Sequence, residues 1–184
     1  MKNNILRYSL VLGLITIISA SILAYSYDLT KDRIKEAIRQ DFLAGLKSVL
    51  PDFDNQPDSD AIITDNATVY LAKNGGAVVG YAVEAVSMKG YGGEISVIVG
   101  AKPDATIYRI TVVRHTETPG LGDKIKAAAF TSLFSGGSLT GKYAVKRDGG
   151  DIDSFSGATI SPRAVCEAVN NANKLLYEVI CETK

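Results

Sequence analysis

The first fifty residues contain two successive hydrophobic patterns. Residues 8–27 form a stretch without a charge that is rich in Leu, Ile, Val, Ala and Ser. A helix of this length spans about 30 Å, the thickness of the bilayer hydrocarbon core. The apolar region of a cleaved signal peptide is normally only about 7–15 residues long. The pattern therefore predicts a retained transmembrane anchor over residues 1–27, with a cleaved signal peptide as the alternative.

Residues 28–50 follow with an amphipathic pattern. Apolar residues recur at intervals of four while charged residues fill the other side, which predicts a connecting helix with one buried stripe. Pro51 is expected to end this helix, because proline lacks a backbone N–H. Lysines and arginines lie on both flanks of the apolar stretch, so their distribution leaves the orientation of the anchor open. The stripe consists of Ile34, Ile38, Phe42, Leu46 and Leu50.

Residues 51–66 are polar and predict a loop, whereas the segment after them alternates with the period of two that is typical of strands. The sequences Asn74-Gly75-Gly76 and Lys102-Pro103-Asp104-Ala105 are turn signals and predict two hairpins. In the last of these strands, strict alternation places Ile107 on the face opposite Ile110. The predicted strands cover residues 69–71, 77–86, 95–99 and 106–113.

The C-terminal third predicts a short strand at 143–145 and two helices. The first covers residues 123–134, and the second has Ser161 as its N-cap and Pro162 at its first position. The inward side chains of the first helix are expected to be Ile125, Ala128, Ala129 and Leu133, and those of the second Val165, Val169, Ala172, Leu176 and Ile180. Hairpins flanked by helices predict an α+β domain with a mostly antiparallel sheet over residues 51–184, behind the N-terminal transmembrane helix.

Composition then excludes several functions. Lys plus Arg and Asp plus Glu both number 20, which argues against a nucleic-acid partner. A single histidine, His115, rules out a polyhistidine metal site, and no metal site is expected. Cys166 and Cys181 fall in one predicted helix about 22 Å apart. A disulfide needs Cα atoms within about 7 Å, so both cysteines are expected to be free thiols.

Three glycine-containing motifs carry the candidate chemistry. Each also has a plain structural interpretation, as a turn, a strand-to-helix connection and a helix cap respectively. Functionally, glycine-rich backbone can approach a ligand closely, Leu121 offers an apolar surface for a planar ring, and the hydroxyl of Thr159 is an attachment point beside a helix N-terminus that favours phosphate. The motifs span Lys89–Glu94, His115–Lys124 and Asp153–Ser161.

Together these motifs resemble a known family. The segments Gly90-Tyr91-Gly92-Gly93, His115 through Gly122, and Ser156-Gly157-Ala158-Thr159 are similar to those of RnfG, the covalently flavinylated protein of the Rnf electron-transport complex. NqrC of the sodium-pumping NADH:quinone reductase shares the same FMN-binding domain. The resemblance extends from the membrane anchor to the last helix, and the short length of the chain favours the Rnf protein.

The resemblance implies a cofactor and its site. FMN is expected to be joined through its phosphate to Thr159, as a phosphothreonine ester made by a flavin transferase. No catalytic residue is expected, because the redox chemistry belongs to the cofactor. The residues that the resemblance assigns to FMN are Tyr91, Gly92, Gly93, Glu117, Thr118, Pro119, Gly120, Leu121, Gly122, Ser156, Gly157, Ala158, Thr159 and Ser161.

The resemblance also implies a role and a location. The chain is expected to relay electrons in a membrane-bound, ion-translocating ferredoxin:NAD oxidoreductase, beside other membrane and peripheral subunits. It would cross the cytoplasmic membrane once, in contact with the lipid bilayer, and place its flavin domain on the extracytoplasmic side. The alternatives are the equivalent protein of the quinone reductase, and an anchored binding or assembly module without a cofactor.

Overall fold

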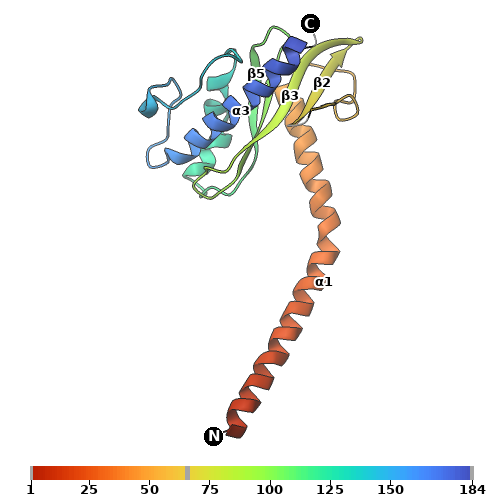
Figure 1. The fold of residues 1–184 in the computed structure, drawn as a ribbon, viewed down its shortest axis with the longest axis vertical. Helices are drawn as coiled ribbons and strands as arrows, with labels where there is room; N and C mark the ends of the chain where they lie inside the picture. Colours follow the sequence, from red (N-terminus) through yellow and green to blue (C-terminus); the bar gives the residue numbers. More distant parts are fainter. Residues whose placement is uncertain (1, 65–66, 183–184) are drawn as a thin grey trace. The chain divides into compact units, whose positions relative to one another are not determined.

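The computed structural model describes residues 2–64 and 67–182 (Figure 1). The chain forms two compact units, Met1–Asp41 and Phe42–Lys184. The first is helical throughout its described residues, from Lys2 on. The second contains an antiparallel sheet and helices, which confirms the predicted α+β class. The predicted division at residues 27 and 50 stays a prediction.

One helix, α1 (Lys2–Val49), contains both predicted N-terminal segments without a break and ends two residues before Pro51, as expected. Its N-terminal part is long and apolar enough to cross a membrane. The hydroxyls of Thr16 and Ser21 donate to carbonyl oxygens four residues earlier, at 2.8 Å each. These polar groups are therefore satisfied within the helix, as a bilayer requires.

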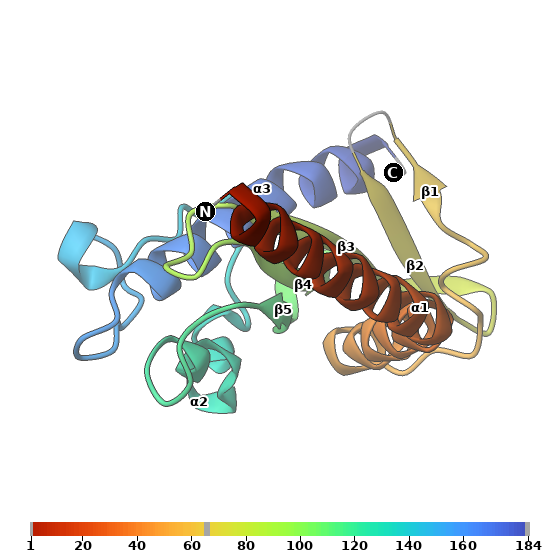
Figure 2. The ribbon, with the colours of Figure 1, turned by 90° about the horizontal axis from the view of Figure 1, so that it is seen from below.

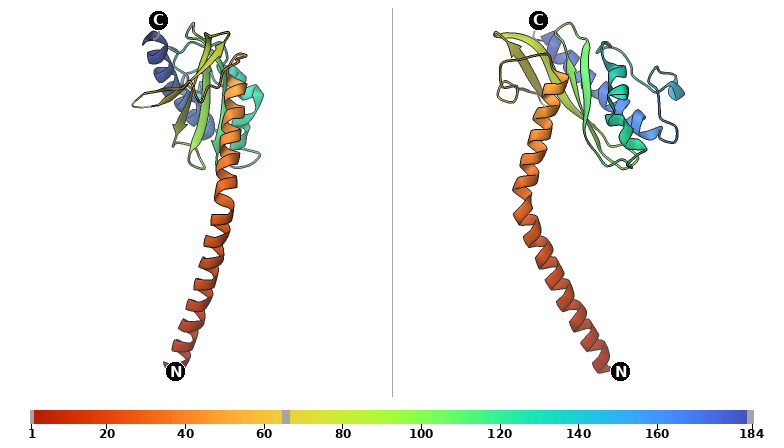
Figure 3. Two further views of the ribbon diagram at one scale, coloured as in Figure 1. Left: turned by 90° about the vertical axis from the view of Figure 1, so that its right-hand side faces the viewer. Right: turned by 180° about the vertical axis from the view of Figure 1, so that it is seen from behind.

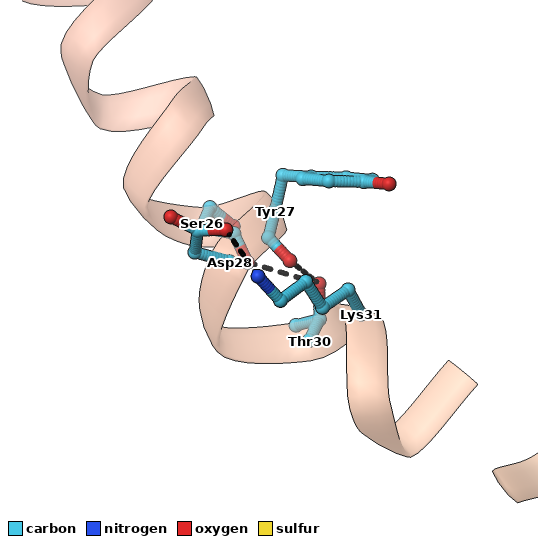
Figure 4. A network of polar contacts seen from close by, with 5 residues as sticks. All are labelled: Ser26, Tyr27, Asp28, Thr30 and Lys31. Atoms are coloured by element: carbon cyan, nitrogen blue, oxygen red, sulfur yellow. Dashed lines mark hydrogen bonds and ion pairs between the residues drawn. The ribbon is translucent and has the colours of Figure 1, made fainter. Parts of the chain in front are cut away.

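A polar network marks the end of the apolar stretch (Figure 4). Thr30 Oγ1 donates to the carbonyl oxygens of Ser26 and Tyr27, at 2.9 and 3.3 Å. Lys31 pairs with Asp28 at 2.8 Å, one turn away on the same helix. Charged pairs thus begin directly after the uncharged segment, where a membrane helix would enter the headgroup region.

The stripe predicted for residues 28–50 is buried only in its second half. Leu46 and Leu50 are buried, and Phe42 is partly buried and stacks edge-on against Tyr70 at 5.1 Å. Ile34 and Ile38 are 51% and 46% exposed, so the prediction that they are buried is wrong. The periodicity predicted the helix correctly, but it does not show how much of the helix is packed against another element.

The sheet contains five strands in the order β1-β2-β3-β4-β5, and every neighbouring pair is antiparallel. Figure 2 shows the strands in this order. Strand β1 is a two-residue strand inside the predicted loop and was not predicted. The strands are β1 (Ile62–Ile63), β2 (Thr68–Asn74), β3 (Ala77–Ser87), β4 (Ile95–Ala101) and β5 (Ile107–His115).

Both predicted hairpins are confirmed. Asn74 pairs with Ala77, so the first hairpin closes through Gly75 and Gly76 alone. These glycines have φ values of 57° and 85°. Two consecutive positive φ angles are the geometry of a type I′ turn, which matches the twist of the strands it joins.

The predicted alternation fails in β5 at one point. The pairing between β4 and β5 shifts at Gly100/Ala101, so that Gly100 pairs with Arg109 while Ala101 pairs with Ile107. This bulge rotates the start of β5. Ile107 therefore lies in the same core cluster as Ile110, and its predicted place on the opposite face is wrong.

Two helical segments cover the two faces of the sheet. Helix α3 (Ile160–Glu182) packs on β3 and β4 through the predicted stripe, all of which is buried. The last turns of α1 pack on the other face in a second cluster, with Leu46 and Val49 against Ala82 and Ile98. Figure 3 shows the strands between these two layers.

The helix predicted for residues 123–134 is replaced by three short helices, and the extended backbone of Ala127 (φ −63°, ψ 136°) separates the first from the second. Ala128, Ala129 and Leu133 are exposed, contrary to prediction, and Ile125 is buried as expected. Two aromatic rings of this region, Phe130 and Phe134, are buried instead, with their centroids 5.6 Å apart. The segments are η1 (Gly122–Lys126), α2 (Ala128–Thr131) and η2 (Ser132–Phe134).

Two further predictions concern the C-terminal third. Residues 143–145 form no strand, and Val145 makes only an isolated parallel bridge to Ile152. Cys166 and Cys181 are both free, as their spacing in one helix predicts.

Close packing of α1 against β4 generates a test. A Cβ on Gly100 would overlap the carbonyl oxygen of Val49, which belongs to rigid backbone. A Cβ on Gly45 would meet the movable ends of Ile98 and Val113, at 2.8 and 2.9 Å. We expect Gly100→Ala to lower the free energy of unfolding by about 1–3 kcal/mol. Gly45→Ala should cost less, because alanine also favours the helix by about 1 kcal/mol. If thermal denaturation shows that both variants lose the same free energy of unfolding, this packing argument is contradicted.

Candidate functional site

A cavity of about 370 Å³, here called the motif cavity, lies where the three glycine motifs meet. Its volume falls in the range of small-molecule sites, about 300–1,000 Å³. The first motif follows β3, the second follows β5 and the third precedes α3. The residues that line the cavity are Tyr91, Glu117, Thr118, Leu121, Gly122, Gly157, Ala158, Thr159, Ile160 and Ser161.

The lining agrees with most of the predicted site. The predicted residues that lie outside the lining are Gly92, Gly93, Pro119, Gly120 and Ser156. Ile160 lines the cavity and was not predicted, although its position between Thr159 and Ser161 would have suggested it. The structure thus brings most of the predicted residues to one place, and their role toward FMN stays a prediction.

The carboxylate of Glu117 joins the three motifs. It is only 5% exposed. Its Oε1 accepts the backbone N–H of Gly92 at 3.0 Å, and its Oε2 accepts the hydroxyl of Ser161 at 2.5 Å. Buried carboxylates are stable only when such donors replace water. Glu117 therefore holds the motif loops together from inside the site.

Glycine is required around Glu117 because the backbones approach too closely for a side chain. The hydroxyl of Thr116 donates to the carbonyl oxygen of Gly92 at 2.7 Å, and a Cβ on Gly92 would overlap the carbonyl oxygen of Thr116. A Cβ on Gly122 would lie 2.6 Å from Glu117 Oε2 and 2.8 Å from Ser161 Oγ. Side chains at either position would separate the groups that Glu117 connects.

The expected N-cap at Ser161 is wrong. Helix α3 begins at Ile160, and the first helical hydrogen bond runs from the Arg163 N–H to the Thr159 carbonyl oxygen at 3.3 Å. Thr159 therefore occupies the N-cap position, and Pro162 lies in the first turn rather than at its first residue. The Ser161 hydroxyl donates to Glu117 instead of capping the helix. A long-range partner has replaced the local one that the sequence suggested.

A tight turn presents Thr159 to the cavity. The Ala158 N–H donates to the Phe155 carbonyl oxygen at 3.1 Å, and Gly157 takes a φ of 80°. Only glycine adopts this conformation without strain. The Thr159 hydroxyl lies 3.5 Å from Nη1 of Arg147. The cavity thus has a hydroxyl group on its lining with a cation beside it.

His115 supports the second motif but does not line the cavity. Its Nδ1 accepts the backbone N–H of Glu117 at 3.2 Å, so that nitrogen carries no proton. Burial first, and then the charge of Lys126, lowers the pKa of the imidazole below its ordinary value. His115 is therefore a neutral acceptor that shapes the loop, and not a proton donor to the cavity.

Apolar side chains surround the cavity without being buried themselves. Tyr91 is 72% exposed, Ile160 44% and Leu121 39%. A flat aromatic ring seated in the cavity would cover some of this surface. The cavity volume, these side chains and the Thr159 hydroxyl together fit a flavin mononucleotide. Within residues 2–64 and 67–182, no group of three His, Cys, Asp or Glu residues is placed to hold a metal ion.

Two family models match the chain. Residues 90–174 match the FMN-binding domain, and residues 1–49 match the RnfG N-terminal region. The G subunit of the ion-translocating oxidoreductase complex of Cereibacter sphaeroides is 41% identical over 182 residues, which cover 92% of this chain and 83% of that protein. The G subunit of the same complex from Vibrio atlanticus is 39% identical over 188 residues, covering 94% and 90%.

Solved structures show the same fold. The crystal structure of Shewanella oneidensis NqrC superposes with a TM-score of 0.52 at 27% identity, covering 63% of this chain and 61% of that one, which is less than two thirds of its length. The C subunit of the Na(+)-translocating NADH-quinone reductase from Parabacteroides distasonis superposes with a TM-score of 0.52 at 21% identity, covering 73% and 79%. The second likeness concerns the fold alone.

The role of Glu117 can be tested by Glu117→Gln. A glutamine carbonyl can accept from only one of the two donors, Gly92 N–H and Ser161 O–H, and leaves the other without its charged partner. We expect the free energy of unfolding to fall by about 1–3 kcal/mol. The control is Glu94→Gln, since Glu94 is 44% exposed and contacts Arg114 at 3.5 Å; it should stay within about 0.5 kcal/mol. Urea denaturation measures the free energy of unfolding of both variants. Similar decreases for Glu117→Gln and Glu94→Gln would refute the role of Glu117 in holding the loops together.

Proposed function

Since the chain belongs to the RnfG family of ion-translocating oxidoreductase complexes, we propose that its motif cavity holds FMN bound covalently through Thr159. The chain is a subunit of an Rnf-type electron-transport complex and carries an FMN-binding domain. We further propose which residues hold the flavin and on which side of the membrane it lies.

The observation that carries this proposal is the convergence of three separate motifs on one cavity with Thr159 on its lining. Esterification would join Thr159 Oγ1 to the phosphorus of FMN. The donor would be a flavin dinucleotide handled by a flavin transferase: as the Oγ1–P bond forms, the pyrophosphate P–O bond breaks, a nucleoside monophosphate leaves, and the hydroxyl proton passes to solvent. Because the ester is covalent, the flavin stays at its site at a permanently high effective concentration.

The other lining residues have distinct proposed roles. Leu121, Ile160 and Tyr91 would cover apolar parts of the isoalloxazine ring, because their exposed surfaces border the cavity. Glu117 would hold the loops rather than exchange protons, since both of its oxygens accept bonds from the protein. The bound flavin supplies the electron-transfer chemistry, and the protein positions it.

The similarities to known proteins help to decide between the Rnf-type protein, its quinone-reductase counterpart and an anchored module without a cofactor. The two oxidoreductase-complex relatives from Cereibacter and Vibrio are about 40% identical along nearly the whole chain, whereas the two quinone-reductase proteins are 21–27% identical. This difference favours the Rnf-type complex, with its other subunits as partners. The match to an FMN-binding domain disfavours a module without a cofactor.

The ester can be tested by Thr159→Ala. Wild-type protein co-expressed with a flavin transferase should show flavin fluorescence in a denaturing gel, because only a covalent bond survives denaturation. Thr159→Ala should lose this signal completely, since the attacking oxygen is gone. The control is Thr118→Ala, which alters another threonine of the cavity lining and should keep the signal. Persistent fluorescence of Thr159→Ala, with mass mapping to another residue, would refute the assignment.

We also propose that α1 anchors the chain in the cytoplasmic membrane and that the flavin domain faces the extracytoplasmic side. A membrane-impermeant amine reagent applied to intact spheroplasts should then label exposed lysines of the domain, such as Lys102 and Lys124. Lysines are used because several are exposed, whereas only one of the two thiols is: Cys181 is exposed, and Cys166 is buried, which raises its pKa to about 12. A cytoplasmic protein serves as control, and labelling of the domain only after lysis would place it inside.

A further inference from the structure

A short cationic loop lies beside Thr159. The helix η3 (Lys146–Asp148) follows Val145 and ends at Gly149, which has a φ of 83°. The bridge between Val145 and Ile152 closes the loop, with the Lys146 N–H donating to the Ile152 carbonyl oxygen at 2.8 Å. These backbone contacts give the loop a defined shape.

Two of the cations around this loop are already neutralised. Lys146 pairs with Asp153 at 2.8 Å. Arg163 of α3 forms a bidentate salt bridge with Asp148, in which Nε and Nη2 each lie 2.5 Å from a carboxylate oxygen. The hydrogen bond from Arg163 holds the pKa of Asp148 below its ordinary value, so this carboxylate stays charged. The pair also ties the loop to the helix that begins after Thr159.

Arg147 differs from Lys146 and Arg163 because, in the part of the chain that the structure describes, no ion pair joins it to a carboxylate. Arg147 acts on Asp148 only at longer range, while Asp148 pairs directly with Arg163. The Nη1 of Arg147 instead lies 3.5 Å from Thr159 Oγ1, the atom that would carry the ester. Arg147 is exposed. An arginine beside a hydroxyl and without a direct ion pair is suited to an anion that is attached to that hydroxyl.

We propose that Arg147 binds the phosphate of the flavin ester at Thr159, and that the Asp148–Arg163 pair holds it in position. This inference rests on the proposed function. A phosphodiester keeps one negative charge at neutral pH, and the planar guanidinium fork matches phosphate oxygens better than an ammonium does. Arg147 would thus place a positive charge beside the negative charge of the ester, and its removal should cost little stability before the ester forms.

A thermodynamic cycle between Arg147 and the ester tests this inference. Wild-type chain and Arg147→Gln are purified in detergent with and without co-expressed flavin transferase, and the four melting temperatures are compared. Without flavin the two should melt close together, because Arg147 is exposed and its 3.5 Å contact with the Thr159 hydroxyl is a weak one. With flavin, Arg147→Gln should melt about 3 °C below the wild type. The gap should shrink in 0.5 M salt, because salt screens an exposed ion pair.

Controls separate this inference from the function on which it rests. Lys146→Gln removes a neighbouring cation that pairs with Asp153 and should behave alike with and without flavin. Equal melting temperatures of the loaded wild type and Arg147→Gln would overturn the inference while leaving the ester intact. A wild type that is itself non-fluorescent would refute the ester instead. If Arg147→Gln takes up no flavin, recovery with Arg147→Lys supports the charge pairing, and no recovery overturns it.

Discussion

The candidate site depends on one buried carboxylate. Glu117 accepts hydrogen bonds from the Gly92 N–H and the Ser161 hydroxyl, and so connects segments that follow β3 and β5 with the first turn of α3. The donors replace the water that the charge loses on burial, which makes the arrangement stable and directional. The close approach of Gly92 and Gly122 to this group explains why the surrounding loops contain glycine.

The sheet brings these segments within reach of one carboxylate. Ile95 pairs with both Ser87 and His115. The end of β3, the start of β4 and the end of β5 therefore lie at the same end of the sheet. Helix α3 packs across β3 and β4 through an apolar stripe, so that its N-terminus lies near the same loops. On the opposite face, the last turns of α1 bury Val49 against the sheet. Firm packing on both faces lets the irregular loops between the elements keep a defined shape.

Residues at the site divide between those that hold it and those that face the cavity. Glu117, His115 and Thr116 keep the loops in place through hydrogen bonds to backbone. Thr159 and the apolar side chains of Leu121 and Ile160 are left for a ligand. This division agrees with an electron-transfer protein, in which the cofactor carries the chemistry and the polypeptide supplies position and electrostatic surroundings.

Local patterns determined much of this protein. The length of the apolar stretch, the turn at Gly75-Gly76 and the buried stripe of α3 each depend on neighbouring residues, and each could be predicted. Contacts between distant residues decided the rest. A bulge turned Ile107 toward the core, an extended backbone at Ala127 interrupted an expected helix, and Glu117 drew Ser161 away from the capping role its sequence position suggested. The motifs could be found in the sequence because their residue types are unusual together, but only tertiary structure decided which of their side chains face the cavity and which hold it.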